Sequence, residues 1–285
     1  MSRRLLATGL LSAVVGVGAC YDLEPFLYGR KRVEHYTLPA EGDTPEETVA
    51  PEQIEPVELV VDGQVRLGAA YVKATQQPPR AYVLYFHGIC CNLNQHIARP
   101  KGLANLGYDV LVFDYRGWGT STDLEPTEPG LLEDSRAALA WLSARAGVPA
   151  ERIVYYGRSF GSAVATQLAS HVPPAALVLE SPFSSVQGLV RDSSNMDLPG
   201  GFFAEGSWDT EGRVRSLQGV PLLLLHGTTD DFIRPEFSEH LYSVAREPKQ
   251  LVLVEGADHD NLPQRMGVDY ARTLGAFMEV ARTRP

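Results

Sequence analysis

Short apolar runs alternate with amphipathic stretches from residue 57 onward, and this alternation constrains the fold more than any other feature. Apolar runs that predict strands occupy residues 81–86, 110–113, 153–156, 177–179, 222–225 and 251–254. Between them, amphipathic stretches predict helices at residues 97–106, 130–146, 160–170, 237–245 and 262–282. Strands that are apolar throughout are typical of a parallel sheet buried on both faces. The sequence therefore predicts a doubly wound α/β domain with a mostly parallel sheet.

A hairpin is predicted at the start of this domain. Residues 57–61 and 66–72 have strand character and flank Asp62-Gly63, a pair that supplies the positive φ of a tight turn. We find no internal repeat and no second domain, so residues 57–285 are expected to form one unit.

The first twenty residues have the pattern of an export signal. Arg3 and Arg4 are followed by an uncharged apolar run that ends at Cys20, and this run is shorter than the roughly 20 residues a membrane-spanning helix needs. The residues just before Cys20 resemble the bacterial lipobox, which makes Cys20 the predicted site of lipid attachment. We expect an exported, membrane-anchored lipoprotein facing the periplasm or the cell exterior, with a single uncleaved N-terminal membrane anchor as the alternative.

The acidity of the chain is concentrated in one segment. The formal net charge is −10, yet residues 33–65 contain nine acidic side chains and no Lys or Arg. Together with its prolines, this composition predicts that residues 21–56 form an extended acidic spacer. An irregular arm packed along the domain is the alternative. The rest of the domain is nearly neutral and has no basic stripe, so we expect no binding of nucleic acid.

The three cysteines do not form a metal or cofactor motif. Cys20 belongs to the export segment, and Cys90 and Cys91 are adjacent, a spacing that disfavours a disulfide between them. The sequence has no C-x-x-C, no H-E-x-x-H and no spaced Cys/His cluster. We therefore expect no metal and no cofactor.

Polar residues of three kinds follow the predicted strands, at the edge of the sheet where ligands bind in α/β folds. Ser159 lies in Gly157-Arg158-Ser159-Phe160-Gly161, directly after one strand and before a helix. This strand–turn–helix context is typical of a nucleophilic serine held on a strained turn. A structural helix cap is the plain alternative.

A histidine and an aspartate follow two later strands. His259 is the candidate base that would activate Ser159, and Asp230 is the candidate acid that would orient the imidazole. Asp231 and Asp258 are the alternative candidates for the acid that orients His259. His87 and His226 each precede a glycine at a strand end, and we expect them to make structural hydrogen bonds within their turns.

Acyl transfer also needs donors for the oxyanion that develops on the substrate. The backbone N–H of Phe160 lies at the start of the helix after Ser159, where amides are unpaired and the helix dipole favours an anion. The backbone N–H of Ile89, just past His87-Gly88, is the second predicted donor.

These segments together resemble the α/β-hydrolase superfamily over about residues 57–282. The resemblance is carried by segments that follow in order along the chain: Phe86-His87-Gly88, Asp114-Tyr115-Arg116-Gly117-Trp118-Gly119, Gly157-Arg158-Ser159-Phe160-Gly161, Glu180-Ser181-Pro182-Phe183 and His226-Gly227-Thr228-Thr229-Asp230. The chain is more closely similar to the branch with depalmitoylase-like and serine-aminopeptidase-like hydrolases. The resemblance implies Ser159, Asp230 and His259 as a triad, and Ile89 and Phe160 as oxyanion donors.

The fold implied by this resemblance usually carries a cap, which here would be short and span about residues 184–219. Its aromatic residues are Phe202, Phe203 and Trp208, which either line an acyl site or pack the cap onto the body. We expect a serine hydrolase that cleaves esters or thioesters of a small-molecule or lipid-like acyl substrate.

Two other functions are weighed against this one. The first is a peptidase of the aminopeptidase type, in which cap carboxylates would bind a free amine. The candidates for that role are Asp192, Asp197, Glu205 and Asp209. The second is a non-catalytic binding protein of hydrolase fold, against which the intact Ser, Asp and His count.

Overall fold

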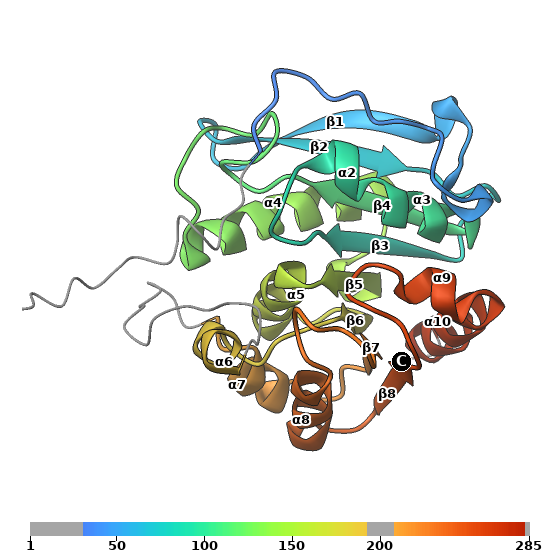
Figure 1. Ribbon diagram of the computed structural model, residues 1–285. Coiled ribbons are helices and arrows are strands. Elements are labelled where there is room, and N and C mark those ends of the chain that lie inside the picture. Colours follow the sequence, from blue (N-terminus) through green and yellow to red (C-terminus); the bar gives the residue numbers. More distant parts are fainter. Residues whose placement is uncertain (1–30, 193–207, 283–285) are drawn as a thin grey trace, which may run out of the picture.

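The computed structural model describes residues 31–192 and 208–282, and within them the chain forms one eight-stranded sheet (Figure 1). The strands are β1 (Ile54–Val60), β2 (Arg66–Val72), β3 (Ala81–Phe86), β4 (Tyr108–Phe113), β5 (Ile153–Arg158), β6 (Ala176–Glu180), β7 (Leu222–Gly227) and β8 (Lys249–Val254). Their order across the sheet is β1-β2-β4-β3-β5-β6-β7-β8. The hairpin β1–β2 and the β2–β4 pair are antiparallel, and the remaining pairs are parallel. The predicted α/β architecture is confirmed.

Helices follow each of the strands from β3 to β8. They are α2 (Leu93–His96), α3 (Ala98–Asn105), α4 (Glu128–Ala146), α5 (Phe160–His171), α6 (Val186–Asp192), α7 (Thr210–Ser216), α8 (Glu236–Val244), α9 (Leu262–Met266) and α10 (Val268–Arg282). The helix predicted at residues 97–106 agrees with α3 within one residue at each end, and the short α2 before it was not predicted. The last predicted helix is wrong in its extent. It is broken at Gly267, whose φ of 53° lies in the left-handed region and interrupts the helix between α9 and α10.

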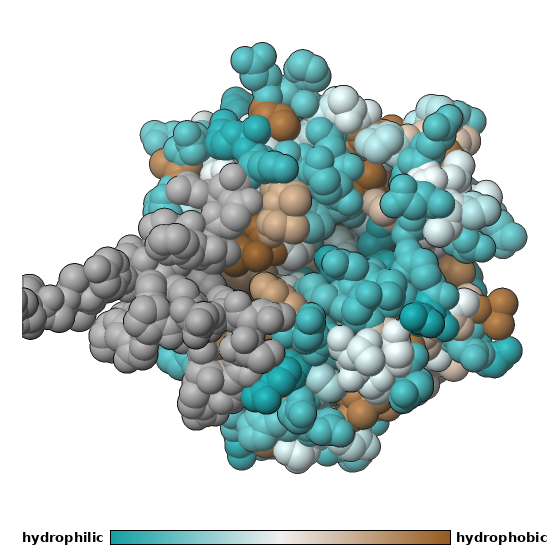
Figure 2. All heavy atoms as spheres, viewed as in Figure 1, coloured by the Kyte–Doolittle hydropathy of each residue, from teal (hydrophilic) through white to brown (hydrophobic). Residues whose placement is uncertain are grey.

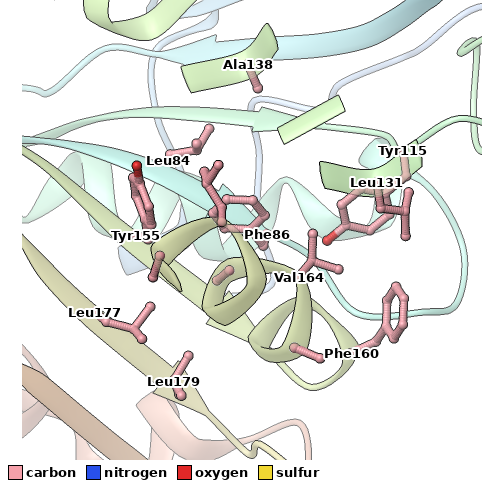
Figure 3. Close-up of a cluster of buried hydrophobic side chains, with 14 of the residues drawn as sticks. Leu84, Phe86, Tyr115, Leu131, Ala138, Tyr155, Phe160, Val164, Leu177 and Leu179 are labelled. Atoms are coloured by element: carbon pink, nitrogen blue, oxygen red, sulfur yellow. The ribbon is translucent and has the colours of Figure 1, made fainter. Parts of the chain in front are cut away.

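The core lies in two layers, one on each face of the sheet. Because side chains alternate along a strand, Leu84 and Phe86 of β3 face one layer and Val83 and Tyr85 face the other. The first layer contains buried residues of α4, α5, α7 and α8, and the second those of α2, α3, α9 and α10. Figure 3 shows the first layer, where side chains from the sheet meet Val164 of α5 and Leu131 of α4. This packing fixes the strand ends that carry the candidate site.

The acidic segment lies against the domain as an irregular arm over residues 33–53. Lys101 of α3 donates to the carbonyls of Pro39 and Glu41 at 2.8 and 2.7 Å. The hydroxyl of Tyr36 donates to Asp114 Oδ2 at 2.7 Å, and Gln264 Nε2 donates to Glu47 Oε1 at 3.0 Å. Strand β1 starts inside the predicted spacer. The domain boundaries drawn from the sequence stay predictions.

The export-type segment with Cys20 lies outside the described residues, as do Asp197, Phe202, Phe203 and Glu205. Across residues 31–192 and 208–282, none of the helices is both long and apolar enough to cross a bilayer. The face seen in Figure 2 is mostly hydrophilic, with hydrophobic residues in small separate groups.

Candidate active site

Ser159 lies on the tight turn between β5 and α5, as the sequence predicts. Its φ of 54° and ψ of −125° are a strained combination for a residue with a side chain, which costs on the order of 1–3 kcal/mol. This turn needs glycine at two positions. A Cβ at Gly161 would collide with the carbonyl of Phe86, and a Cβ at Gly157 would collide with the backbone of Gly161. The amide of Ser159 donates to the Glu180 carbonyl at 2.8 Å. The serine is thus held at the carboxyl end of β5.

Asp230 and His259 form a hydrogen-bonded pair. The Nδ1 atom of His259 lies 2.8 Å from Asp230 Oδ2, while Asp230 Oδ1 accepts from the amide of Ile233 at 2.8 Å. Burial on its own would raise the pKa of the Asp230 carboxyl. Hydrogen bonds from His226 and His259 outweigh burial and hold that pKa well below its ordinary range. Asp230 is therefore an ionised acceptor. It favours the tautomer of His259 with the proton on Nδ1, in which Nε2 is able to accept a proton.

The two rival aspartates have other surroundings. Asp258 accepts from the amides of Asp260 and Asn261 at 2.9 and 3.0 Å, so it closes the turn of its own loop. Asp231 is exposed. Of the three carboxylates weighed from the sequence, Asp230 is the one that the structure places on the imidazole of His259.

His226 makes the structural hydrogen bonds that the sequence predicts for it. Its Nδ1 lies 2.6 Å from Ser238 Oγ, and its Nε2 lies 2.7 Å from the Ile233 carbonyl. The same Nε2 is 3.3 Å from Asp230 Oδ2, a contact that the sequence does not reveal. Asp230 is therefore held by histidines on two sides.

The loop after β3 lies beside the serine. A Cβ on Gly88 would be 3.6 Å from the Cβ of Ser159, so this loop passes at van der Waals distance. Trp118 Nε1 donates to the Ile89 carbonyl at 3.0 Å, and the imidazole of His87 is fully buried with its Nε2 3.1 Å from Asp114 Oδ1. These contacts fix the loop that carries the predicted Ile89 donor next to Ser159.

Aromatic contacts at the start of α5 join the cap to the body. The ring of Phe160 packs against that of Trp208 at 4.9 Å and 68°, and Trp208 is almost completely buried. Trp208, which lies in the segment predicted to form the cap, therefore packs against α5, which corresponds to one of the two roles the sequence left open for the cap aromatics.

Cys91 follows the Ile89 loop with a φ of 69°, in the left-handed region. The carbonyl of the preceding Cys90 accepts from His96 Nε2 at 2.6 Å. Cys90 is exposed, but partial burial and the neighbouring Cys91 raise the pKa of its thiol to about 11. At neutral pH the Cys90 side chain is therefore a thiol rather than a reactive thiolate.

A buried ionic network beside the site is the feature that the sequence did not reveal. Glu180, at the end of β6, is fully buried and pairs with Arg99 Nη2 at 2.7 Å and with Arg158 Nε at 3.5 Å. Burial alone would raise the pKa of Glu180, but Arg99 and Arg158 outweigh it and lower that pKa. Two features of the sequence could have indicated this network: Arg158 directly precedes Ser159, and Glu180 ends the next strand.

Comparisons with known proteins agree with this architecture. A model of the alpha/beta hydrolase fold matches residues 82–197. The uncharacterized protein Rv2307c of Mycobacterium tuberculosis is 36% identical over 239 residues, which are 83% of each chain. The lysophosphatidylserine lipase ABHD12 of Danio rerio is 30% identical over 201 residues, 64% of this chain and 52% of that protein. The crystal structure of the esterase domain of a Rhodothermus marinus protein superposes with a TM-score of 0.59 at 29% identity, covering 79% of this chain and 97% of that one.

Proposed function

This chain belongs to the α/β-hydrolase family and is a hydrolase, and we propose that it is a serine hydrolase that cleaves carboxylic esters or thioesters through an acyl-enzyme. The observation that carries the proposal is the Asp230–His259 hydrogen bond of 2.8 Å at the sheet edge where Ser159 lies on its strained turn. Two of the similar proteins are described as an esterase and a lipase, which supports ester cleavage.

The proposed reaction begins at Ser159. Its Oγ attacks the carbonyl carbon of the substrate and forms a C–O bond while its proton passes to His259 Nε2. Asp230 stabilises the resulting imidazolium. The tetrahedral intermediate collapses when the bond to the leaving group breaks, and His259 gives its proton to the departing alkoxide or thiolate. Water then attacks the acyl-enzyme, with His259 as base, and the acid product leaves with Ser159 protonated again.

The oxyanion of the tetrahedral intermediate needs two donors. We assign them to the backbone N–H of Phe160, at the first turn of α5, and to the backbone N–H of Ile89. The support is that Phe160 begins the helix that follows the nucleophile, and that the Gly88 loop passes beside Ser159. No side chain is required for this step, so the identities of Phe160 and Ile89 are set by packing rather than by chemistry.

Substitution of the serine tests the proposal. We expect Ser159→Ala to abolish labelling by a fluorophosphonate probe and to remove turnover of p-nitrophenyl esters. Ser170→Ala is the matched control, because Ser170 lies on the same helix and its hydroxyl makes local contacts, to the Gln167 carbonyl at 2.8 Å and to Nδ1 of the adjacent His171 at 3.3 Å. A Ser159→Ala protein that keeps its esterase activity sinks the proposal. A panel of esters and thioesters of rising acyl length then identifies the acyl group.

The aminopeptidase alternative is tested in the same panel with aminoacyl nitroanilides. Of the four cap carboxylates considered for amine binding, Asp209 instead caps α7 by accepting from the amide of Gly212 at 2.8 Å. The side chains of the other three lie outside the described residues. We therefore rank ester and thioester cleavage first.

We also propose attachment to a membrane through the N-terminal segment, with export as a lipoprotein modified at Cys20. The support is the sequence pattern alone. Labelling of cells with radioactive palmitate gives the test, because a Cys20→Ala chain that still carries the label contradicts lipid attachment at this residue.

A further inference from the structure

His259 lies on a loop whose start is hydrogen-bonded to Thr228 and Thr229, just after β7. The histidine loop (residues 255–261) connects β8 to α9, and the sheet order places β6 and β7 between the strand before Ser159 and the strand before His259. The ring of His259 contacts Asp230 and, at 5.1 Å between ring centres, Phe232. These contacts orient the ring, but they do not set the distance between the histidine loop and the serine turn.

Arg158 connects the two segments directly. It is the residue immediately before Ser159, and its Nη2 donates to the main-chain carbonyl of His259 at 2.8 Å. The same Nη2 donates to the carboxylate of Asp260, the next residue of the histidine loop. One guanidinium therefore joins the backbone at the candidate base to the backbone at the candidate nucleophile.

The guanidinium of Arg158 also pairs with the buried carboxylate of Glu180. Arg158 is paired with Glu180 across the β5–β6 register, and its Nε lies 3.5 Å from Glu180 Oε1. Arg99 donates to the same Oε1 at 2.7 Å and to the Asp260 carbonyl at 3.3 Å. The Tyr156 hydroxyl donates to the other oxygen of Glu180. Arg158 and Glu180 thus come from β5 and β6, neighbouring strands in the middle of the sheet, and Arg99 of α3 supports the same carboxylate.

On these contacts we propose that Arg158 is a positioning residue, which sets the distance of His259 from Ser159 by clamping the histidine loop to the serine turn. The inference rests on the proposed function, since it assigns a role in the same reaction. Arginine suits the task because its planar fork offers several donors in fixed directions and keeps its charge at any working pH. A lysine at this position keeps the charge beside Glu180 but cannot reproduce the fork.

The test compares kinetics on a p-nitrophenyl ester. Misplacement of a catalytic group by about 1 Å costs roughly 100-fold in rate, so we expect Arg158→Met to lower kcat by about that factor with KM changed less than about 3-fold. We expect Arg158→Lys to lower kcat by about 10-fold, an effect between those of the wild-type arginine and methionine. Arg116 is the matched control, because it is equally buried and pairs with the buried Asp134 away from the histidine loop. We expect Arg116→Lys to leave kcat within about 2-fold.

A double-mutant cycle separates positioning from general damage. If Arg158 acts through His259, then in a His259→Ala background Arg158→Met lowers the remaining rate by less than about 3-fold. An equal loss in both backgrounds overturns the inference. An unchanged kcat in Arg158→Lys also overturns the inference. This variant keeps the positive charge beside Glu180, so it provides the test if the Arg158→Met protein does not fold. Failure of the proposed function is a different result, namely Ser159→Ala and His259→Ala proteins that remain active.

Discussion

Replacement of Asp230 by asparagine isolates the electrostatic part of the candidate site, because the new side chain has nearly the same shape. Its carbonyl oxygen can still accept from the amide of Ile233, now at 2.8 Å from Oδ1. Its NH₂ group takes the place of Oδ2, which lies 2.8 Å from His259 Nδ1. An NH₂ group cannot accept a proton, so His259 must turn its unprotonated Nδ1 toward Asn and carry its proton on Nε2. In the proposed reaction, the Nε2 that should take the proton of Ser159 then already carries one.

The expected loss of kcat for Asp230→Asn is about ten-thousand-fold, the size of effect a wrong tautomer has in this type of triad. This corresponds to a barrier raised by roughly 5.4 kcal/mol. KM is expected to stay within about 3-fold, because Asp230 does not contact the substrate in the proposed reaction. The measurement is the steady-state rate of p-nitrophenol release over a range of ester concentrations.

Stability against acid gives a second readout of the same variant. The folded protein holds the pKa of Asp230 below its unfolded value, so Asp230 stabilises the fold above a pH of about 3.9 and loses this contribution as the pH falls through its folded value. Asp230→Asn should therefore flatten the loss of stability below about pH 4. Asp231→Asn and Asp258→Asn are the controls. A kcat within about 10-fold of the wild type, or a larger loss in either control, would refute the assignment of Asp230.

Three further predictions concern the surroundings of the site. Truncation of the almost completely buried Trp208 to alanine should lower the free energy of unfolding by about 3–5 kcal/mol in a urea titration, and a loss under about 1 kcal/mol would show that the cap does not pack through this ring. Tyr36→Phe removes the hydroxyl that donates to Asp114, and it should lower the free energy of unfolding by about 1.5–3 kcal/mol if the arm belongs to the folded unit; no change would place the arm outside it. Burial, with a smaller effect of His87, holds the pKa of His96 well below 6.5, so only the unfolded chain takes up this proton near pH 6. The free energy of unfolding should accordingly fall by about 1 kcal/mol from pH 7 to pH 5.5, and His96→Gln should remove that part of the slope, whereas an unchanged slope would contradict the buried neutral ring.

The sequence predicted the sheet well because its central strands, β3 to β7, are largely apolar and buried, as parallel strands covered on both faces are. It missed the break at Gly267, since a single glycine in an apolar periodic stretch does not by itself reveal a left-handed φ. It also missed the short helix α2, because four residues are too few to show a helical period.

The sequence left open whether the acidic segment is an extended spacer or an arm packed along the domain, for a different reason. Lys101 binds it through the carbonyls of Pro39 and Glu41, and every residue of a chain carries a carbonyl, so no side-chain pattern marks the contact. The charges that suggested an extended spacer belong to side chains that play little part in these bonds.

At the candidate site, residues that follow strands were predictable and long-range pairings were not. The strand-end rule led to Ser159, Asp230 and His259, because the carboxyl ends of parallel strands meet at one edge. The Arg158–Glu180 pair depends on the β5–β6 register, and its link to the histidine loop depends on how residues 255–261 cross the edge. No pattern of neighbouring residues in the sequence predicts either contact.

The central claim is that Ser159 carries the acyl group during turnover, and intact-protein mass spectrometry after an acid quench tests it most directly. With p-nitrophenyl butyrate as substrate, the protein should gain the mass of one butyryl group, and fragmentation should place that group on the peptide that contains Ser159. The Ser159→Ala protein should gain no mass and release no p-nitrophenol above the rate of the buffer. A butyryl group on another residue, or turnover by the Ser159→Ala protein at the wild-type rate, would contradict the account.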